Sequence, residues 1–240
     1  MVEATAAKVR WQDHRAFLIG ITAAAGWLDA LAFLHLGKVF NSIMTGNVVF
    51  VGLGAGQGDW GRVLRAGVAL AAFVLGSFVA ARLVGRRLMP GAAAVGLART
   101  LAMEGALLAG FAALWLAIGS PADHPGLQVV LLGIGALAMG VQAAIALALK
   151  IPNVATVALT ATIAQLGAFG GWLERDSGVP DDVPSRALMS ALVLTYFAGA
   201  LIVALAPDWP ILALGPVALL AVGVMGWPRP RAARRLPARA

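Results

Sequence analysis

The sequence predicts an all-α protein, a polytopic transmembrane helical bundle with six full spans and two broken or re-entrant segments arranged as an inverted repeat. Hydrophobic residues make up 60% of the 240 residues and charged residues only 12%, whereas soluble globular domains are about half apolar and a quarter charged. The charges gather at the chain ends and between long apolar runs, and polar residues interrupt two of those runs. Eight full spans are the alternative that this pattern leaves open.

The apolar segments are of two kinds. A helix needs about 20 residues to cross a hydrocarbon core about 30 Å thick. Six segments have or approach this length: 16–36, 63–84, 99–119, 127–149, 187–206 and 210–227. Two others, 39–56 and 153–172, are less apolar and carry hydroxyl, amide and glycine residues in their interior. Such residues in mid-membrane are typical of helices that are broken or supported by side-chain hydrogen bonds.

The two broken segments occupy corresponding places in an internal repeat. The repeated stretches begin at Gly20 and Gly133, and both open on Gly-Ile. Each has a glycine before a polar residue and a lysine at its helix end: Asp29 and Lys38 in the first, Gln142 and Lys150 in the second. We therefore divide the chain into an N-terminal segment, 1–15, one transmembrane domain, 16–228, and a basic tail, 229–240. The repeat halves cover about 16–119 and 120–228.

Positive charges predict the orientation of the chain. If both broken segments are re-entrant, 15 of the 18 Lys and Arg lie on one side, with only Lys38, Arg62 and Arg65 opposite. If both cross fully, twelve of the Lys and Arg residues lie on one side of the membrane and six on the other. Cytoplasmic loops are enriched in Lys and Arg, so the first arrangement is favoured and both termini are expected in the cytoplasm. It also gives the two repeats opposite orientations, which is the plan of many secondary transporters.

Polar residues near the middle of the broken segments are candidates for binding. Thr45, Gly46 and Asn47 lie near the expected midplane and could close a half-helix whose amides and carbonyls coordinate a small ion or an anionic group. A tight turn or a packing notch is the alternative. Thr160 and Thr162 take the corresponding places in the second half, where an alanine replaces the glycine.

Asp29 is the first candidate for a functional residue. A carboxylate inside a span costs a few kcal/mol unless it is protonated, paired or hydrated, so a membrane acid is interpreted as functional by default, often as a proton or cation site. Gln142 is its expected counterpart, and we expect Asp29, Asn47 and Gln142 to line one polar cavity. A purely structural hydrogen bond from Asp29 to the hairpin backbone is the alternative.

Two further features have a structural interpretation. Glu104 lies five residues from Arg99, and we interpret it as reaching toward water or an arginine at the membrane boundary. Ala72, Gly76 and Ala80 are spaced by four, which lets helices approach closely. Packing within the bundle is the preferred use of this stripe, and a seam in a homo-oligomer is the other.

Motifs for other functions are missing from the sequence. It contains no HExxH, GxSxG, P-loop or cysteine nucleophile, so we expect no enzyme, no metal site and no cofactor. The net charge of +7 sits in membrane loops rather than on an aromatic-interleaved face, so we expect membrane lipid rather than nucleic acid as a partner.

Four short motifs resemble the YoaK-like family of bacterial inner-membrane proteins, a domain of unknown function. They are Gly26-Trp27-Leu28-Asp29-Ala30, Gly37-Lys38-Val39-Phe40, Met44-Thr45-Gly46-Asn47 and Met139-Gly140-Val141-Gln142. The resemblance spans about residues 18–205. It implies that the protein lies in a bacterial inner membrane, and it supplies no substrate. The chain has Ala143 where the family often has Asn, and Ala161 where it often has Gly.

The function that these features favour is a small secondary transporter or permease for an unknown small solute or ion, coupled to protons or cations through Asp29. A non-transport membrane scaffold, lipid-binding or assembly protein is the alternative. Polar residues that converge on one cavity would favour transport, and polar residues that are individually satisfied would favour the scaffold.

Overall fold

A computed structural model describes residues 14–84, 92–149, 159–169, 186–206 and 209–226. The described residues form helices and no strand, which confirms the all-α prediction. The helices are α1 (Arg15–His35), α2 (Met44–Gln57), α3 (Trp60–Val84), α4 (Ala92–Ile118), α5 (Pro125–Leu149), α6 (Thr160–Phe169), α7 (Arg186–Leu205) and α8 (Gly215–Met225), with the 3-10 turns η2 (Pro121–Asp123) and η3 (Pro210–Leu214). Nearly all of the predicted N-terminal segment and the whole basic tail lie outside the described residues.

Five of these helices are long and apolar enough to cross a membrane: α1, α3, α4, α5 and α7. The sixth expected span consists of η3 and α8, a shorter apolar stretch from Pro210 to Met225. The helices α2 and α6 have 14 and 10 residues, and their lengths of about 21 and 15 Å are too short for a full crossing. The chain is therefore a polytopic helical bundle.

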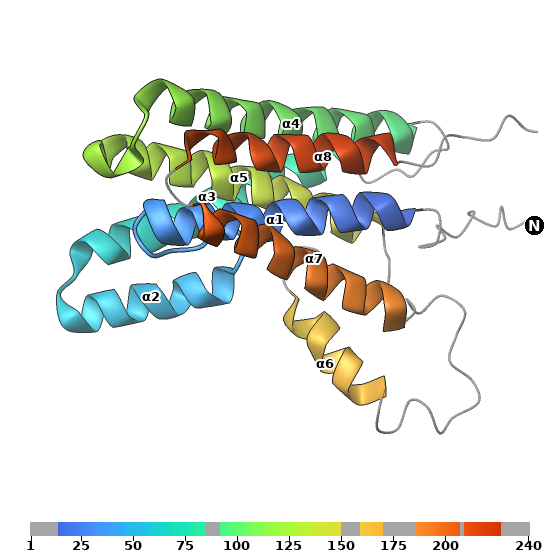
Figure 1. Ribbon diagram of the computed structural model, residues 1–240, viewed down its shortest axis with the longest axis horizontal. Coiled ribbons are helices and arrows are strands. Elements are labelled where there is room, and N and C mark those ends of the chain that lie inside the picture. The colour runs from blue at the N-terminus through green and yellow to red at the C-terminus, as the bar shows by residue number, and fades with distance from the viewer. Residues whose placement is uncertain (1–13, 85–91, 150–158, 170–185, 207–208, 227–240) are drawn as a thin grey trace, which may run out of the picture.

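The long helices lie side by side between two ends of the bundle, which we name after the first and last residues of α1 (Figure 1). At the Arg15 end, Gly96 at the start of α4 lies against Leu83 at the end of α3. At the His35 end, the imidazole of His35 contacts the indole of Trp115, near the end of α4. The helix α8 returns to the Arg15 end, where Gly226 lies against Ala16, so α1 begins and α8 ends at the same end.

The two short helices run in opposite directions. Each begins near the middle of the bundle, and α2 runs out to the His35 end whereas α6 runs out to the Arg15 end (Figure 1). The helix α2 ends at Gly58, which has the left-handed φ of 73° that suits a glycine C-cap. The described cations are divided between the ends: Arg15, Arg82, Arg99 and Arg186 at one, and Lys38, Arg62 and Arg65 at the other. Which end faces the cytoplasm stays a prediction.

Helix packing pairs the two halves in the same way. The first helix of each half packs against the last two helices of the other: α1 against α7 and α8, and α5 against α3 and α4. Glycines bring the backbones together at both main crossings, because a Cβ on Gly26 would overlap the Tyr196 carbonyl and a Cβ on Gly140 would overlap the Phe73 carbonyl. Gly76, from the stripe of small residues on α3, packs in this way against Leu137 of α5, inside the bundle.

Candidate functional site

A sharp reversal follows α1 and begins the re-entrant segment, residues 36–43. Gly37 and Lys38 have φ values of +96° and +63°, in the left-handed region. Glycine adopts this conformation without strain, whereas a lysine there costs about 1–2 kcal/mol. The Arg65 Nε donates a hydrogen bond of 3.3 Å to the Gly37 carbonyl and holds the reversal against α3. The chain thus turns back into the bundle directly after the first span.

Asp29 holds the inner part of the re-entrant segment. Its Oδ1 accepts hydrogen bonds from the backbone N–H groups of Asn41 and Ser42, both at 2.7 Å. Its Oδ2 accepts the hydroxyl of Ser42 and, at 2.5 Å, the hydroxyl of Tyr196 on α7. The carboxyl group is only 3% exposed, so these four donors replace the water that it lacks. Because Asp29 lies six residues before the end of α1, the segment reaches about 9 Å into the bundle.

Asn47 holds the same segment from the α2 side. Its amide nitrogen donates to the Phe40 carbonyl at 2.7 Å, and its amide oxygen accepts the Phe40 N–H at 3.0 Å. A backbone group in the membrane interior is costly unless it is paired, and one buried asparagine satisfies both groups of Phe40. Asp29 and Asn47 therefore share one task, which is to pair the backbone of a segment that is not helical.

The glycine between Thr45 and Asn47 has a different role from the one expected for a half-helix closure. Gly46 has no left-handed φ and lies in the first turn of α2, with an ordinary helical backbone. A Cβ at Gly46 would stand 3.2 Å from the Phe40 ring, so the small residue makes room for that ring. Thr45 is exposed on the outer face of α2.

Gln142 lies elsewhere in the bundle. Its side-chain nitrogen donates a hydrogen bond of 3.0 Å to the Ile21 carbonyl of α1, and its oxygen has no hydrogen-bond partner. An open groove of about 270 Å³ reaches Asp29 and Tyr196 between α1, α7 and the re-entrant segment, and its other walls are apolar. Neither Asn47 nor Gln142 lines this groove. The three residues have different partners: Asp29 and Asn47 bond to the re-entrant segment, Asp29 bonds also to Tyr196, and Gln142 bonds to α1, so this groove does not bring them together.

The helix crossings also change the expected counterpart of Asp29. The contacts of α1 recur in α5 at an offset of 114 positions. Gly140 corresponds to Gly26, and Leu137, whose carbonyl lies against Gly76, corresponds to Ala23, whose carbonyl lies against Gly199. This register aligns Asp29 with Ala143, whereas the repeat in the sequence aligned it with Gln142. The reason is that the close contact of each glycine with the backbone of the opposite helix, and not the polar residues, sets how each pair of helices meets.

Tyr196 was missed by the sequence analysis. It is the only tyrosine of the chain and lies inside the apolar helix α7. A buried tyrosine hydroxyl normally finds a hydrogen-bond partner, so a lone tyrosine in a span is the signal that could have identified it. Thr160 and Thr162, at the start of α6, are exposed and buried respectively. Residues 150–158, which precede them, lie outside the described residues.

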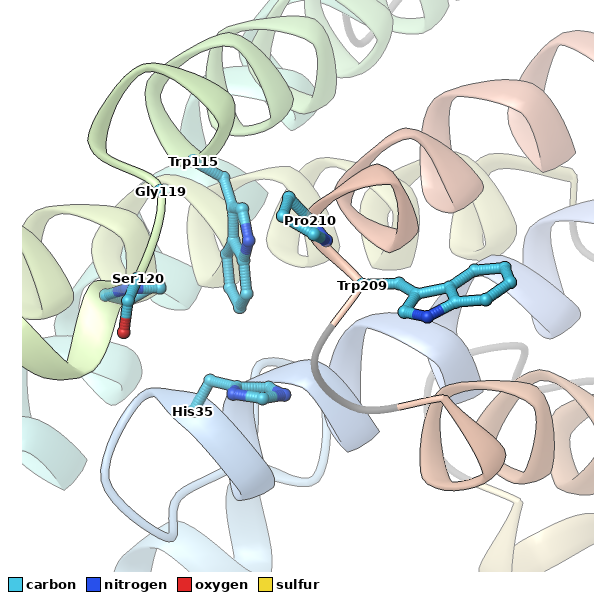
Figure 2. A pocket seen from close by; sticks show the side chains of 7 residues that line it. His35, Trp115, Gly119, Ser120, Trp209 and Pro210 are labelled. Atoms are coloured by element: carbon cyan, nitrogen blue, oxygen red, sulfur yellow. The ribbon is translucent and has the colours of Figure 1, made fainter.

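A second cavity, of about 360 Å³, opens at the His35 end. Trp115 from α4 and His35 from α1 approach it from opposite sides, and their rings meet edge to face with centroids 5.4 Å apart (Figure 2). Gly119, Ser120, Pro121, Trp209 and Pro210 complete its lining. No cluster of His, Asp or Glu among the described residues could hold a metal ion.

Comparisons with known proteins support the conclusion that the chain is a membrane protein. The family described as "Protein of unknown function (DUF1275)" matches residues 17–227. A curated relative from Bacillus subtilis (strain 168), the UPF0700 transmembrane protein YoaK, is 32% identical over 190 residues, which cover 77% of this chain and 80% of the relative. No solved structure matches the chain.

Proposed function

Because the chain belongs to the DUF1275 family of membrane proteins, whose description assigns no activity, we propose a function from its geometry: a small secondary transporter or permease. In this proposal Asp29 couples a proton or a small cation to movement of the re-entrant segment. One observation carries it. The Asp29 carboxyl group joins the re-entrant segment of the first half to Tyr196 of the second half, at the floor of an open groove.

The hydrogen bonds of Asp29 make it suited to such coupling. Its Oδ2 serves only two hydroxyl groups, those of Ser42 and Tyr196, which can turn away or find water. A proton or a small cation bound at Oδ2 competes with both hydroxyls and loosens α7 from the re-entrant segment. Such a ligand shifts the conformation because it binds the loosened state better than the closed one.

The opposite directions of α2 and α6, together with the matching crossings of α1 with α7 and α5 with α3, support an inverted repeat. Transporters of this plan bind substrates near the midplane, where discontinuous helices begin. We further propose that the chain lies in the bacterial inner membrane with both termini in the cytoplasm, in contact with lipid, as a monomer or a homo-oligomer, and without an enzymatic reaction. The substrate class is a small solute or ion.

Accessibility labelling tests the proposal without knowledge of the substrate. The chain has no cysteine, so Ala200→Cys places one thiol in the groove beside Asp29. In proteoliposomes we expect a membrane-impermeant thiol reagent to modify this cysteine at a rate that depends on pH or on Na⁺. In the added presence of Asp29→Asn, which nearly keeps the shape but removes the charge, that dependence should disappear.

Leu194→Cys is the matched control. Leu194 lies on the same helix, is 64% exposed and is not part of the groove, so its cysteine should face lipid and stay unmodified. If the Ala200→Cys thiol stays unmodified under every condition, the groove is closed to water and the transport proposal fails. The scaffold alternative would then be favoured, since the hydrogen-bonding groups of Asp29 and Asn47 are each satisfied within the protein.

A further inference from the structure

A second acid lies in the bundle with no part in the proposed coupling. Glu104 is fully buried, on a stripe of α4 that also contains Thr100, Leu108, Phe111 and Trp115. Both of its carboxyl oxygens lack a hydrogen-bond partner. The expectation that Glu104 reaches toward water or Arg99 is therefore wrong, because Arg99 lies on the exposed side of the helix. Five residues turn a helix by about 500°, so the two side chains leave it in different directions.

Glu104 is also deep in the bundle. Gly96 marks the Arg15 end of α4, where it lies against Leu83 and Val84. Eight residues separate Gly96 from Glu104, which is about 12 Å of helix, and fourteen separate Glu104 from Ile118, about 21 Å. With a core about 30 Å thick, the carboxyl group lies within the hydrocarbon region.

The neighbouring helices bring no charge to Glu104. The main neighbours of α4 are α3, α5, η3 and α8, and in their described residues only α3 carries charged or titratable groups, namely Arg62, Arg65 and Arg82. The helix α1 also reaches α4 at the His35 end, where His35 contacts Trp115, about 16 Å along the helix from Glu104. Arg62 pairs with Asp59 at 3.4 Å and Arg65 bonds to the Gly37 carbonyl, both at the His35 end. Arg82 lies over the Phe78 ring, 4.6 Å from its centroid, at the other end.

An ionised carboxylate without a cation or a hydrogen-bond donor is prohibitively costly in such a place, whereas a neutral carboxylic acid needs only one acceptor. Thr100 lies one helical turn away on the same face of α4, and its side chain is not hydrogen-bonded to Glu104 in this structure. Its hydroxyl hydrogen is directed to the backbone, since Oγ1 donates to the Gly96 carbonyl at 2.6 Å. The lone pairs of that oxygen remain, so a neutral Glu104 that turns toward Thr100 can donate to it, whereas a carboxylate would need a donor that the hydroxyl already gives to Gly96.

We infer that Glu104 is a proton-binding site, in which a neutral carboxylic acid is held in the core one helical turn from the hydroxyl of Thr100. The proton enters from water, forms the O–H bond of the acid, and returns to water when that bond breaks. Gly96, Thr100 and Glu104 follow one another at intervals of four residues, so they form a line along one face of α4 from the bundle end to the core.

Infrared spectroscopy of the protein in lipid tests this inference directly. A protonated carboxylic acid has a carbonyl band that neither a carboxylate nor an amide shares. We expect Glu104→Gln to lose one such band at neutral pH, and Asp29→Asn to keep it. If Glu104→Gln leaves the carboxylic-acid region of the spectrum unchanged, the acid is not protonated and the inference is overturned.

Two Thr100 variants test whether the neutral acid donates to the Thr100 hydroxyl. Thr100→Val keeps the shape but removes the hydroxyl, so the carboxylic-acid band of Glu104 should shift. Thr100→Ser should restore the position of the band. An unchanged band in Thr100→Val would exclude Thr100 as the acceptor.

Carbodiimide labelling checks the unsubstituted chain, so that no result depends on a variant that fails to fold. A carbodiimide takes the proton of a neutral carboxylic acid onto its nitrogen, and its carbon bonds to the carboxyl oxygen, giving a stable acylurea after rearrangement. With a hydrophobic carbodiimide we expect mass spectrometry to find the adduct on Glu104 at neutral pH, and to lose it as the pH is raised. Absence of the adduct at low pH would contradict the inference. Since these methods detect the proton itself, their outcome is distinguishable from that of the transport proposal.

Discussion

The crossing of α1 with α7 and the crossing of α5 with α3 have the same backbone geometry but different chemistry. Each is formed by one glycine per helix, Gly26 with Gly199 and Gly140 with Gly76, placed against the backbone of the opposite helix. Beside the first crossing, Asp29 accepts the hydroxyl of Tyr196 and the donors of the re-entrant segment. At the corresponding places of the second crossing the chain has Ala143 and Phe73.

The difference separates the residues that build the bundle from those that support a non-helical segment. Two helices in a membrane associate through close van der Waals packing, which small residues allow, so both crossings need their glycines. Polar side chains are needed in addition where backbone groups have lost their helical partners. The carboxyl group of Asp29 and the hydroxyl of Tyr196 are present at the crossing where residues 41 and 42 have such groups.

The largest expected effect comes from adding bulk at either crossing. Gly26→Val and Gly140→Val would each force a side chain into a backbone carbonyl, so we expect both to destabilise the protein by more than about 3 kcal/mol and to abolish a monodisperse gel-filtration peak in detergent. Gly67→Val on α3 is the control, because a Cβ there meets nothing within 4 Å. Tolerance of Gly140→Val alone would break the equivalence of the two crossings.

A smaller effect is expected from deleting the acid. Asp29→Ala leaves two backbone N–H groups and two hydroxyls without their acceptor, and we expect a loss of about 2–4 kcal/mol in thermal or denaturant unfolding. Ala143→Gly is the matched change at the second crossing and should cost only about 1 kcal/mol, the helix penalty of glycine. Equal losses at the two positions would show that Asp29 contributes only its side-chain volume.

The smallest effect is expected from removing the Tyr196 hydroxyl, which tests its bond to Asp29 alone. Tyr196→Phe makes the first crossing resemble the second and removes one hydrogen bond to Asp29, so we expect a loss of about 1 kcal/mol. Combined with Asp29→Asn it should be non-additive by at least about 0.5 kcal/mol, because the two side chains contact each other. The reverse change, Phe73→Tyr, should give no gain, since Ala143 offers its hydroxyl no acceptor. Full additivity would contradict a direct bond.

Much of the architecture could be predicted from the sequence. Five of the six predicted spans, the early return of 39–56 and the separation of Lys38, Arg62 and Arg65 from the other described cations agree with the structure. The candidate site was predicted in part. Asp29 and Asn47, which the sequence singled out, both bond to the re-entrant segment, but Tyr196 was missed and Gln142 bonds to Ile21 of α1 instead of lying beside Asp29.

The sequence by itself determined the membrane environment, the helical class and the positions of the spans, because each depends on local properties: about 20 apolar residues for a crossing, and polar or glycine residues where a helix breaks. Only the tertiary structure decided that Asp29 meets Tyr196, that Ala143 is its counterpart and that Glu104 is sealed from Arg99. This is because the direction of each side chain around its helix axis decides which neighbour it can contact. Successive residues on a helix point about 100° apart, and which direction meets a neighbour depends on where glycines let another helix approach, far away in the chain.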